Sequence, residues 1–484
     1  MDFGKAAKYL VVIALVCVAG WLLIWGPRGA GGNADDRVVI DYWEKWSGEE
    51  EKQMREVVDE FNATVGAEKK IFVRYTSTSA VSQKTLVATA AGVPPDVAGL
   101  WDLNVVQFAA LDALIPLEHM AAEHGITSET YKPGYWKACN YDGHLYALVS
   151  SPAAIALLYN RKIFDESASQ LRAAGLDPNR PPKTIAELDA YAKALDQVDS
   201  NGVIVRAGFL PTEPGWYISL ATYWFGGTLF DEKTQKFTFT DPKNLEAMKW
   251  IASYAQRLGR KSINDFQSGV AGGAVQWDSP QNPFLTGVVA MEMHGPWMAN
   301  YIRNLKPVMT GLPPGQTDNP QDGAAARQAR SLYAYAPFPP VSPQYEGATY
   351  LQFDAICIPK GAKHPKEAFE WIAYLQRQDV MEHLGKLRST PSPLAKVSDD
   401  FLNHNANPYI NVFETLARSP NARGVPQTPV WAEAGDELGN AVTSVATLDD
   451  TPEHALQQAQ DRIEKISKSF QVKQQKRHAK DGSE

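Results

Sequence analysis

The chain has 484 residues, 44% of them hydrophobic and 21% charged, which is the composition of a globular protein large enough for two domains or two lobes. The net charge is −8 and the body carries no basic stripe, which argues against nucleic acid as a partner. The nine histidines are scattered and no Cys or His spacing fits a metal site, so we expect neither a metal nor a cofactor.

An uncharged apolar run extends from Tyr9 to Trp25, with Lys5 and Lys8 before it. Positive charge ahead of such a run predicts an amino terminus in the cytoplasm and an exported body. The run is long for a signal-peptide core and slightly short for a standard membrane span, so cleavage and retention both stay open. We expect an uncleaved signal anchor followed by a flexible tether that ends at residue 36.

Three cysteines give little information on the fold. Cys17 lies in the leader, which leaves Cys139 and Cys357 in the exported part. An oxidising compartment allows these two to form one disulfide, and two free buried thiols are the alternative.

The exported part begins with alternating patterns of strand and helix. Apolar runs of strand length and apolar residues at helical spacing follow one another in the order 37–43 (strand), 49–62 (helix), 71–75 (strand), 81–91 (helix) and 92–98 (a turn into a third strand). This alternation predicts a parallel sheet with helices on its faces.

Further along the chain, Ser151-Pro152 interrupts an apolar stretch, and we expect the chain to leave one lobe for the other there. Thr184, followed by Glu187 three residues later, predicts a capped helix start. The pattern continues with a hairpin at 230–241, a helix at 242–258, a polar and mobile loop at 306–328, a return between lobes at 334–340, helices at 365–378 and 452–470, and a frayed basic tail.

One strand indicates where a ligand could bind. The apolar run from Gly287 to Met293 leads into Gly295-Pro296, which ends the strand and places Trp297 just beyond its carboxyl end. Ligands of open α/β sheets bind at that edge. An indole offers a flat apolar face and one N–H donor, which suits the C–H face of a sugar ring. The alternative is a tryptophan of the core.

Eight short motifs follow one another along residues 37–470: W.G within Trp43–Gly48, Pro95-Asp96, LIPLE at Leu114–Glu118, LLYNRKIF at Leu157–Phe164, P.T..EL at Pro182–Leu188, FGG.LF at Phe225–Phe230, G..AM...GPW ending at Trp297, and IPKGAKHPKEAFEWIAYL at Ile358–Leu375. In this order they resemble the family 1 extracellular solute-binding proteins, which include the maltose and glycerol-phosphate binding proteins. Each motif alone is weak, and together they support the fold more than any one ligand.

The resemblance implies an α/β protein of the type II periplasmic-binding-protein fold, with a hinge and a ligand cleft between two lobes. Ligand binding would close the lobes, and the permease subunits of an ABC importer would bind the closed form. We expect one amino-terminal membrane helix and no enzymatic activity. The expected divisions are 1–36 (leader and tether), 37–150 plus 340–395 (first lobe), 151–339 plus 396–470 (second lobe) and 471–484 (disordered basic tail).

Three tryptophans are predicted to stack on the ligand from the second lobe. Trp297 is the first, and the resemblance places Trp216 and Trp431 at positions where relatives have stacking aromatics. From the first lobe we expect contacts by residues that follow the first and third strands, namely Trp43, Glu44, Trp46, Trp101 and Asp102. Carboxylates can fix sugar hydroxyls by charge-assisted hydrogen bonds.

The charged members of this set also fit purely structural roles. Asp102 could be a helix N-cap, and Glu44 a solvated loop charge. Arg388 could reach an anionic ligand or only compensate the dipole at a helix end.

The leading hypothesis is a periplasmic or extracytoplasmic receptor that delivers a mono- or oligosaccharide to an ABC importer, held at the membrane by residues 9–25. The alternatives are a sensing module that signals to a membrane kinase and a carbohydrate-active hydrolase with a carboxylate pair. Among other ligands, iron would require clustered tyrosines and a polyamine a carboxylate-rich cleft. The tryptophans favour a sugar.

Overall fold

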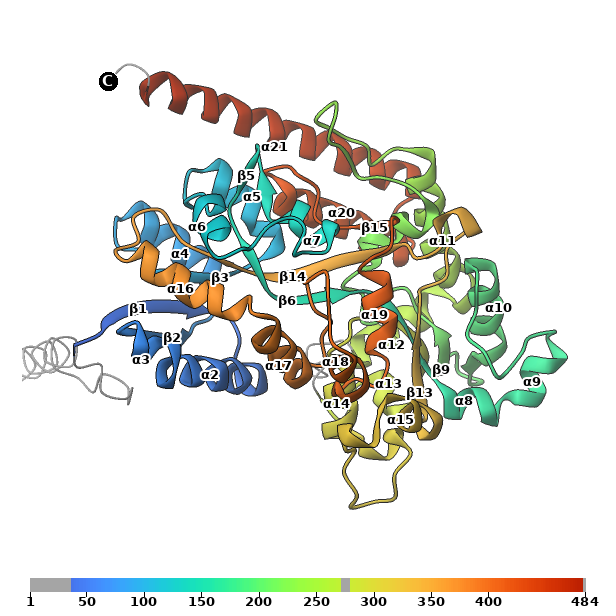
Figure 1. The fold of residues 1–484 in the computed structure, drawn as a ribbon. Coiled ribbons are helices and arrows are strands. Elements are labelled where there is room, and N and C mark those ends of the chain that lie inside the picture. Colours follow the sequence, from blue (N-terminus) through green and yellow to red (C-terminus); the bar gives the residue numbers. More distant parts are fainter. Residues whose placement is uncertain (1–35, 271–278, 482–484) are drawn as a thin grey trace, which may run out of the picture.

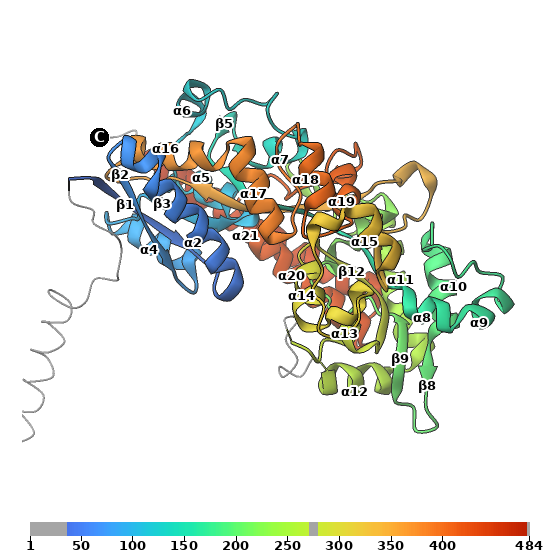
Figure 2. The same ribbon diagram turned by 60° about the horizontal axis from the view of Figure 1, so that its bottom comes forward.

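A computed structural model describes residues 36–270 and 279–481. This part of the chain forms two lobes, each a mixed α/β unit built on its own sheet (Figures 1 and 2). The leader with Cys17, and Trp277, lie outside the described residues. Within the described ranges no helix is both long and apolar enough to cross a membrane.

The first lobe is built on a six-stranded sheet with the order β15-β14-β3-β1-β2, and β6 also pairs with β14. β1 is parallel to both β2 and β3, whereas β14 runs antiparallel to β3 and β6. The strands are β1 (Val38–Glu44), β2 (Ile71–Ser77), β3 (Val97–Trp101), β6 (Leu148–Ala154), β14 (Thr349–Cys357) and β15 (Ala422–Arg423), with β4 (Asn140–Tyr141) and β5 (His144–Leu145) as a separate hairpin.

Amphipathic helices cover this sheet. In α2, Met54, Val57, Val58 and Phe61 form the buried face, and three glutamates occupy the first turn, where they suit the helix dipole. The helices here are α2 (Gly48–Ala63), α3 (Val65–Glu68), α4 (Val81–Ala90), α5 (Asp102–Ala110), α6 (Glu118–Glu123), α7 (Pro133–Ala138), α16 (Pro365–Leu375) and α17 (Gln378–Arg388).

The second lobe is built on a five-stranded sheet with the order β13-β7-β12-β9-β8. Its central strand β12 is buried along its whole length, is parallel to β9 and is antiparallel to β7. The strands are β7 (Ala156–Asn160), β8 (Gln197–Val198), β9 (Ile204–Phe209), β12 (Val289–His294) and β13 (Tyr333–Ala336), with the hairpin of β10 (Phe230–Asp231) and β11 (Lys236–Phe237) beside it.

The predicted cap of α10 is confirmed, since the Thr184 side chain accepts a hydrogen bond from the backbone N–H of Glu187. The elements from α8 to α15 are α8 (Arg161–Glu166), α9 (Ala168–Ala173), α10 (Ile185–Leu195), η1 (Ile218–Phe225), α11 (Pro242–Leu258), α12 (Arg260–Val270), α13 (Pro283–Thr286), α14 (Met298–Leu305), η2 (Pro307–Thr310), η3 (Pro320–Asp322) and α15 (Ala324–Arg330).

The chain passes between the two sheets at short connections. β6 continues into β7 through the single residue Ile155, so Ser151-Pro152, where we expected the crossing, lies inside β6. β13 leads back to β14 through a segment that contains η4 (Pro343–Tyr345). The last part of the chain then runs through α18 (Asp399–His404), α19 (Ile410–Leu416), α20 (Trp431–Ala446) and α21 (Pro452–Asp481).

The carboxyl-terminal region differs from the predicted frayed tail, because α21 continues through residue 481. The helix starts against α20 and α11 of the second lobe and extends back over the first lobe (Figure 1). There the side-chain amide of Gln474 donates a hydrogen bond to the carbonyl oxygen of Ala110, at the end of α5. This contact ties the end of the helix to the first lobe.

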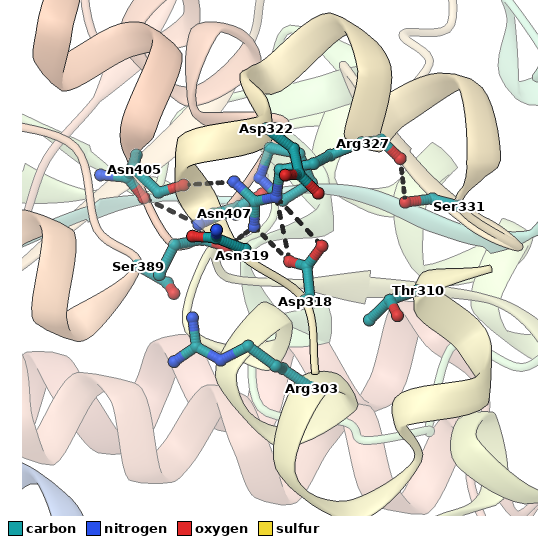
Figure 3. A network of polar contacts seen from close by, with 12 residues as sticks. Arg303, Thr310, Asp318, Asn319, Asp322, Arg327, Ser331, Ser389, Asn405 and Asn407 are labelled. Atoms are coloured by element: carbon teal, nitrogen blue, oxygen red, sulfur yellow. Dashed lines mark hydrogen bonds and ion pairs between the residues drawn. The ribbon is translucent and has the colours of Figure 1, made fainter. Parts of the chain in front are cut away.

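The predicted mobile loop at 306–328 is also wrong, because η2, η3 and α15 form within it. Arg327 has no exposed surface, and its guanidinium holds the segment in place (Figure 3). Its Nε donates to Asp318 Oδ2 at 3.0 Å, and its Nη atoms donate to the carbonyl oxygens of Asn405 and Ala406 at 2.7 and 2.6 Å. These partners fix the polar segment against the chain that follows α18.

The two cysteines of the described part, Cys139 and Cys357, are free buried thiols and form no disulfide with each other.

Candidate ligand-binding site

Two tryptophans meet at the edge of the first sheet. Trp46 follows β1 and Trp101 ends β3, and these parallel neighbours bring their carboxyl ends together. The two rings lie edge to face with centroids 5.4 Å apart. Lys45 Nζ lies 4.5 Å from the ring centroid of Trp101, which adds a cation–π contact.

A buried group of charges supports these rings. Asp354 of β14 accepts a hydrogen bond from the indole N–H of Trp46 at 3.0 Å and pairs with Lys45 Nζ at 3.0 Å. Arg388 Nη1 lies 3.7 Å from the same carboxylate, and its guanidinium lies over the Trp46 ring at 5.8 Å. Burial raises the pKa of Asp354, and the two cations oppose this effect. We call Lys45, Trp46, Trp101, Asp354 and Arg388 the first half-site.

Glu44, which we expected to contact the ligand or to be a solvated loop charge, belongs to the interior. It has no exposed surface, accepts a hydrogen bond from the Tyr42 hydroxyl at 2.7 Å and accepts another from the Lys45 backbone N–H at 2.8 Å. A Cβ at Gly99 would lie 2.0 Å from its carboxylate, so only glycine fits beside it. The buried carboxylate of Glu44 therefore holds Lys45 in place, through its backbone N–H and its ammonium group.

The structure also places Trp43, Asp102 and Arg388. Trp43 is part of β1 and points to the opposite face from Tyr42 and Glu44. Asp102 is the first residue of α5 and 2% exposed; its Oδ2 accepts a hydrogen bond from the Tyr350 hydroxyl at 3.0 Å, and burial raises its pKa to about 7. Arg388 is 3% exposed and ends α17, so its charge is already paired inside the protein.

The second half-site gathers at the end of β12. We define it as Glu213, Trp216, Tyr217, His294 and Trp297. His294 ends β12, and its ring centroid lies 5.5 Å from those of both Trp216 and Trp297. Tyr217 lies 6.5 Å from Trp297, and Trp216 is 43% exposed.

The turn between β12 and Trp297 depends on a glycine. A Cβ at Gly295 would lie 2.1 Å from the Trp297 ring, so only glycine lets the indole fold back over the chain. As the sequence predicts, Trp297 lies just beyond the carboxyl end of the strand.

Trp431, which we expected beside these rings, lies in the core of the second lobe and is 6% exposed. It is the first residue of α20, and its spacing with Ala434 and Leu438 places all three on the buried face of that helix. The structure thus favours a packing role for Trp431.

β14 joins the two half-sites. Its alternate residues Tyr350, Gln352 and Asp354 share one face of the strand. Tyr350 donates to Asp102, Asp354 holds Trp46, and Gln352 accepts a hydrogen bond from the Tyr217 hydroxyl at 2.7 Å. The polar alternation in the run from Thr349 to Cys357 was a signal that the sequence analysis missed.

The helices that follow the two half-sites also touch. Glu50 lies in α2, shortly after Trp46, and Tyr301 lies in α14, shortly after Trp297. The Tyr301 hydroxyl donates a hydrogen bond to Glu50 Oε1 at 2.6 Å, which bridges the two lobes.

Two surface hollows of about 450 and 580 Å³ lie elsewhere and have no tryptophan in their linings. Among the described residues no group of His, Cys, Asp and Glu could hold a metal ion.

The chain matches the profile of the bacterial extracellular solute-binding proteins over residues 45–382. It is 25% identical over 219 residues to the maltotriose-binding protein of Pyrococcus abyssi, an alignment that covers 45% of this chain and 41% of that protein. It is 27% identical over 218 residues to the sn-glycerol-3-phosphate-binding periplasmic protein of Escherichia coli K12, covering 43% of this chain and 46% of that protein. These two alignments thus span less than half the length of each relative.

Longer matches support the same fold. An uncharacterised ABC transporter extracellular-binding protein of Pyrococcus horikoshii is 21% identical over 399 residues, which cover 81% of this chain and 82% of that one. The solved structure of CpMnBP1 with mannotriose bound has a TM-score of 0.69 at 26% identity and covers 88% of this chain and 99% of its own. The sugar-binding protein MalE of Xanthomonas citri has a TM-score of 0.69 at 20% identity, with 90% and 98% covered.

Proposed function

The chain belongs to the family of bacterial extracellular solute-binding proteins, and we propose that it captures a carbohydrate between its two half-sites and delivers it to an ABC importer. One observation carries the proposal: a single face of β14 reaches tryptophan-bearing sites in both lobes, through Asp354 to Trp46 and through Gln352 to Tyr217. A ligand held there would contact both lobes at once.

The chemistry of the two half-sites suits a saccharide. Four indole rings offer apolar faces for the C–H surface of sugar rings, and buried carboxyl groups offer acceptors for hydroxyl protons. The names of the relatives agree with this ligand class, since one binds maltotriose and one solved neighbour holds mannotriose.

We propose that the lobes close on the ligand about the connections between β6 and β7 and between β13 and β14. A receptor for an importer must differ between its empty and loaded states, and hinge closure supplies that difference. The bond between Tyr301 and Glu50 supports this view, because it joins the two helices that follow the half-sites.

We further propose that the protein works outside the cytoplasmic membrane, held there by residues 9–25, and that it does not change its ligand chemically. The family is extracellular, and its relatives are named as solute-binding proteins. The apolar run in the leader supports the tether.

A titration of tryptophan fluorescence against a panel of mono- and oligosaccharides tests the function. We expect a saturable emission change with at least one sugar, together with a rise in the thermal unfolding midpoint of the same sample. The change should persist in Trp431→Phe, which serves as the matched control, and should shrink in Trp216→Phe. A panel that gives neither signal would rule out a carbohydrate receptor, and sugar recovered in cleaved form would indicate an enzyme.

A further inference from the structure

Glu292 is a buried acid in the middle of β12. It has no exposed surface, and within the described part of the chain neither of its carboxyl oxygens has a hydrogen-bond partner. Leu158 faces it across the pair of strands and belongs to an apolar cluster. An unsatisfied polar group in such surroundings costs about 1–3 kcal/mol, more if it is charged. Packing alone does not account for a residue of this kind.

His294 lies two residues further along the same face of the strand. Its Nδ1 is 3.2 Å from the carbonyl oxygen of Gly295 and carries the hydrogen, so Nε2 presents a lone pair. This Nε2 is buried, has no hydrogen-bond partner among the described residues and lies 4.0 Å from Glu292 Oε1. Burial lowers the pKa of His294 to about 4, so the ring is neutral and offers Glu292 no positive charge.

A second acid, Glu213, adds to the negative charge near Glu292 that no cation in the described ranges balances. Glu213 lies in the turn after β9, three residues before Trp216; it is partly exposed, and burial raises its pKa to about 7. Burial, and next the negative charge of Glu213, raise the pKa of Glu292 well above its ordinary value. Among the described residues the other titratable groups that bear on Glu292 are His294 and Tyr335, and neither is a cation there.

The cations of the first half-site do not balance these acids. Lys45 is paired with Glu44 and Asp354, and Arg388 with Asp354. Glu213 and Glu292 form no salt bridge with a lysine or arginine anywhere in residues 36–270 and 279–481. The end of β12 therefore presents an imidazole nitrogen with a lone pair and two indole rings beside the buried acid Glu292, and the charge of a second acid, Glu213, acts on Glu292.

The group that completes this half-site must be rich in hydrogen-bond donors and positively charged. An ammonium group has three donors and no acceptor, and its charge stabilises the ionised form of both acids, which burial otherwise disfavours. Its bonds to carboxylates are about twice as strong as neutral ones, and indole faces attract cations. A neutral hydroxyl has a single donor and no positive charge, so it cannot stabilise the ionised form of either acid in this way.

We propose that the ligand carries a protonated amine, and that Glu213 and Glu292 hold this amine beside Trp216, Trp297 and His294. This inference rests on the proposed function, because it places the amine on a saccharide that binds between the same half-sites. The amine approaches from the side of Glu213 and Trp216, where the half-site is exposed. Glu292 then completes its coordination from inside the lobe.

The test is calorimetric titration of the full chain with pairs of ligands that differ in one group. Glucosamine is compared with glucose, the β-1,4-linked glucosamine disaccharide with cellobiose, and spermidine represents an amine without a sugar. We expect the amino member of a pair to bind at least about tenfold more tightly. Because amine binding favours the ionised acids, we also expect proton release, seen as a binding enthalpy that depends on the buffer.

Two isosteric variants locate the amine. Glu213→Gln and Glu292→Gln should each abolish most of the preference and the proton release, whereas Glu246→Gln on the exposed face of α11 should change neither. Neutral sugars that bind as tightly as their amino counterparts would overturn the amine and leave the carbohydrate function standing. Binding of spermidine alone would support the amine and contradict the saccharide. Silence from every ligand would overturn both proposals.

Discussion

The two half-sites differ in how their buried charged groups are paired. In the first, Asp354 is surrounded by Lys45, Arg388 and the indole N–H of Trp46, so each charge has an opposite charge beside it, although Arg388 Nε has no hydrogen-bond partner among the described residues. In the second, Glu292 and His294 are equally buried but keep polar atoms that no other described residue satisfies. The difference is therefore one of charge: the first half-site pairs its acids with cations of the protein, and the second has no such cation among the described residues.

That difference has a consequence for mutations. A satisfied charge network loses much when one member is removed, because the remaining charges stay buried. An unsatisfied acid costs stability while it is present, so its neutralisation is expected to be harmless or stabilising in the empty protein. Removal of a charge should therefore lower the stability of the protein in the first half-site. In the second half-site it should weaken ligand binding and leave the stability unchanged or raised.

The largest expected effect is in the first half-site. Asp354→Ala should lower the free energy of unfolding by about 3–5 kcal/mol, because Arg388 and part of the Lys45 charge lose their partner. Urea unfolding measures this change. Asp379→Ala is the matched control, because the Asp379 side chain is 65% exposed and pairs with Arg377 at the surface. Equal effects of the two substitutions would contradict the internal network.

A pair of tryptophans then distinguishes packing from binding. Trp431→Ala should cost about 3–5 kcal/mol of stability, as expected for a buried aromatic. Trp216→Ala, at a position that is 43% exposed, should cost less stability, about 1–2 kcal/mol, while weakening ligand binding at least about tenfold. Thermal unfolding and calorimetric titration of both variants measure these effects. A Trp431→Ala protein that is stable but does not bind the ligand would show that Trp431 belongs to the ligand site.

The pH dependence of stability should reveal the second half-site. The pKa of Glu213 is raised from 4.5 to about 7 on folding, so its contribution is fully present below about pH 4.5 and is lost as the pH rises through 7. Glu213→Gln should therefore flatten the stability profile between these values, with a gain of roughly 1–3 kcal/mol at neutral pH. Urea unfolding across this range measures it. A profile unchanged from the parent protein would show that Glu213 is solvated.

The smallest effect concerns the contact between the lobes. Tyr301→Phe removes the hydroxyl that bonds Glu50 and should weaken the contact between the lobes by about 0.5–1.5 kcal/mol. Ligand affinity should fall about two- to tenfold with little change in unfolding, as calorimetry would show. Tyr141→Phe on the hairpin of β4 and β5 is the control. An affinity that does not change would place this contact outside the closing motion.

Local patterns in the sequence predicted local structure well. The cap at Thr184 and the position of Trp297 after β12 depend on neighbouring residues, and both agree with the structure. Family motifs in order predicted the two-lobed fold, since they extend over most of the chain. That Trp216 and Trp297 contact a ligand stays a prediction.

Features that depend on distant partners could not be predicted in this way. The segment at 306–328 looked mobile because its polar residues find their partners at Asn405 and Ala406, far along the chain. The burial of Trp431 could not be predicted because an indole looks the same in sequence on the buried face of a helix as at a ligand site; its contact with a ligand stays a prediction. Asp354 was missed because its role appears only when β14 meets Trp46.

The course of α21 makes lobe movement observable without any ligand label. The helix starts on the second lobe, yet Gln474 near its far end touches Ala110 of the first. A rotation of the lobes must change the separation across that contact, and the length of the helix magnifies a small angle into a larger displacement. Energy transfer between two dyes, one on each side of the contact between Gln474 and Ala110, would then report whether a ligand is bound.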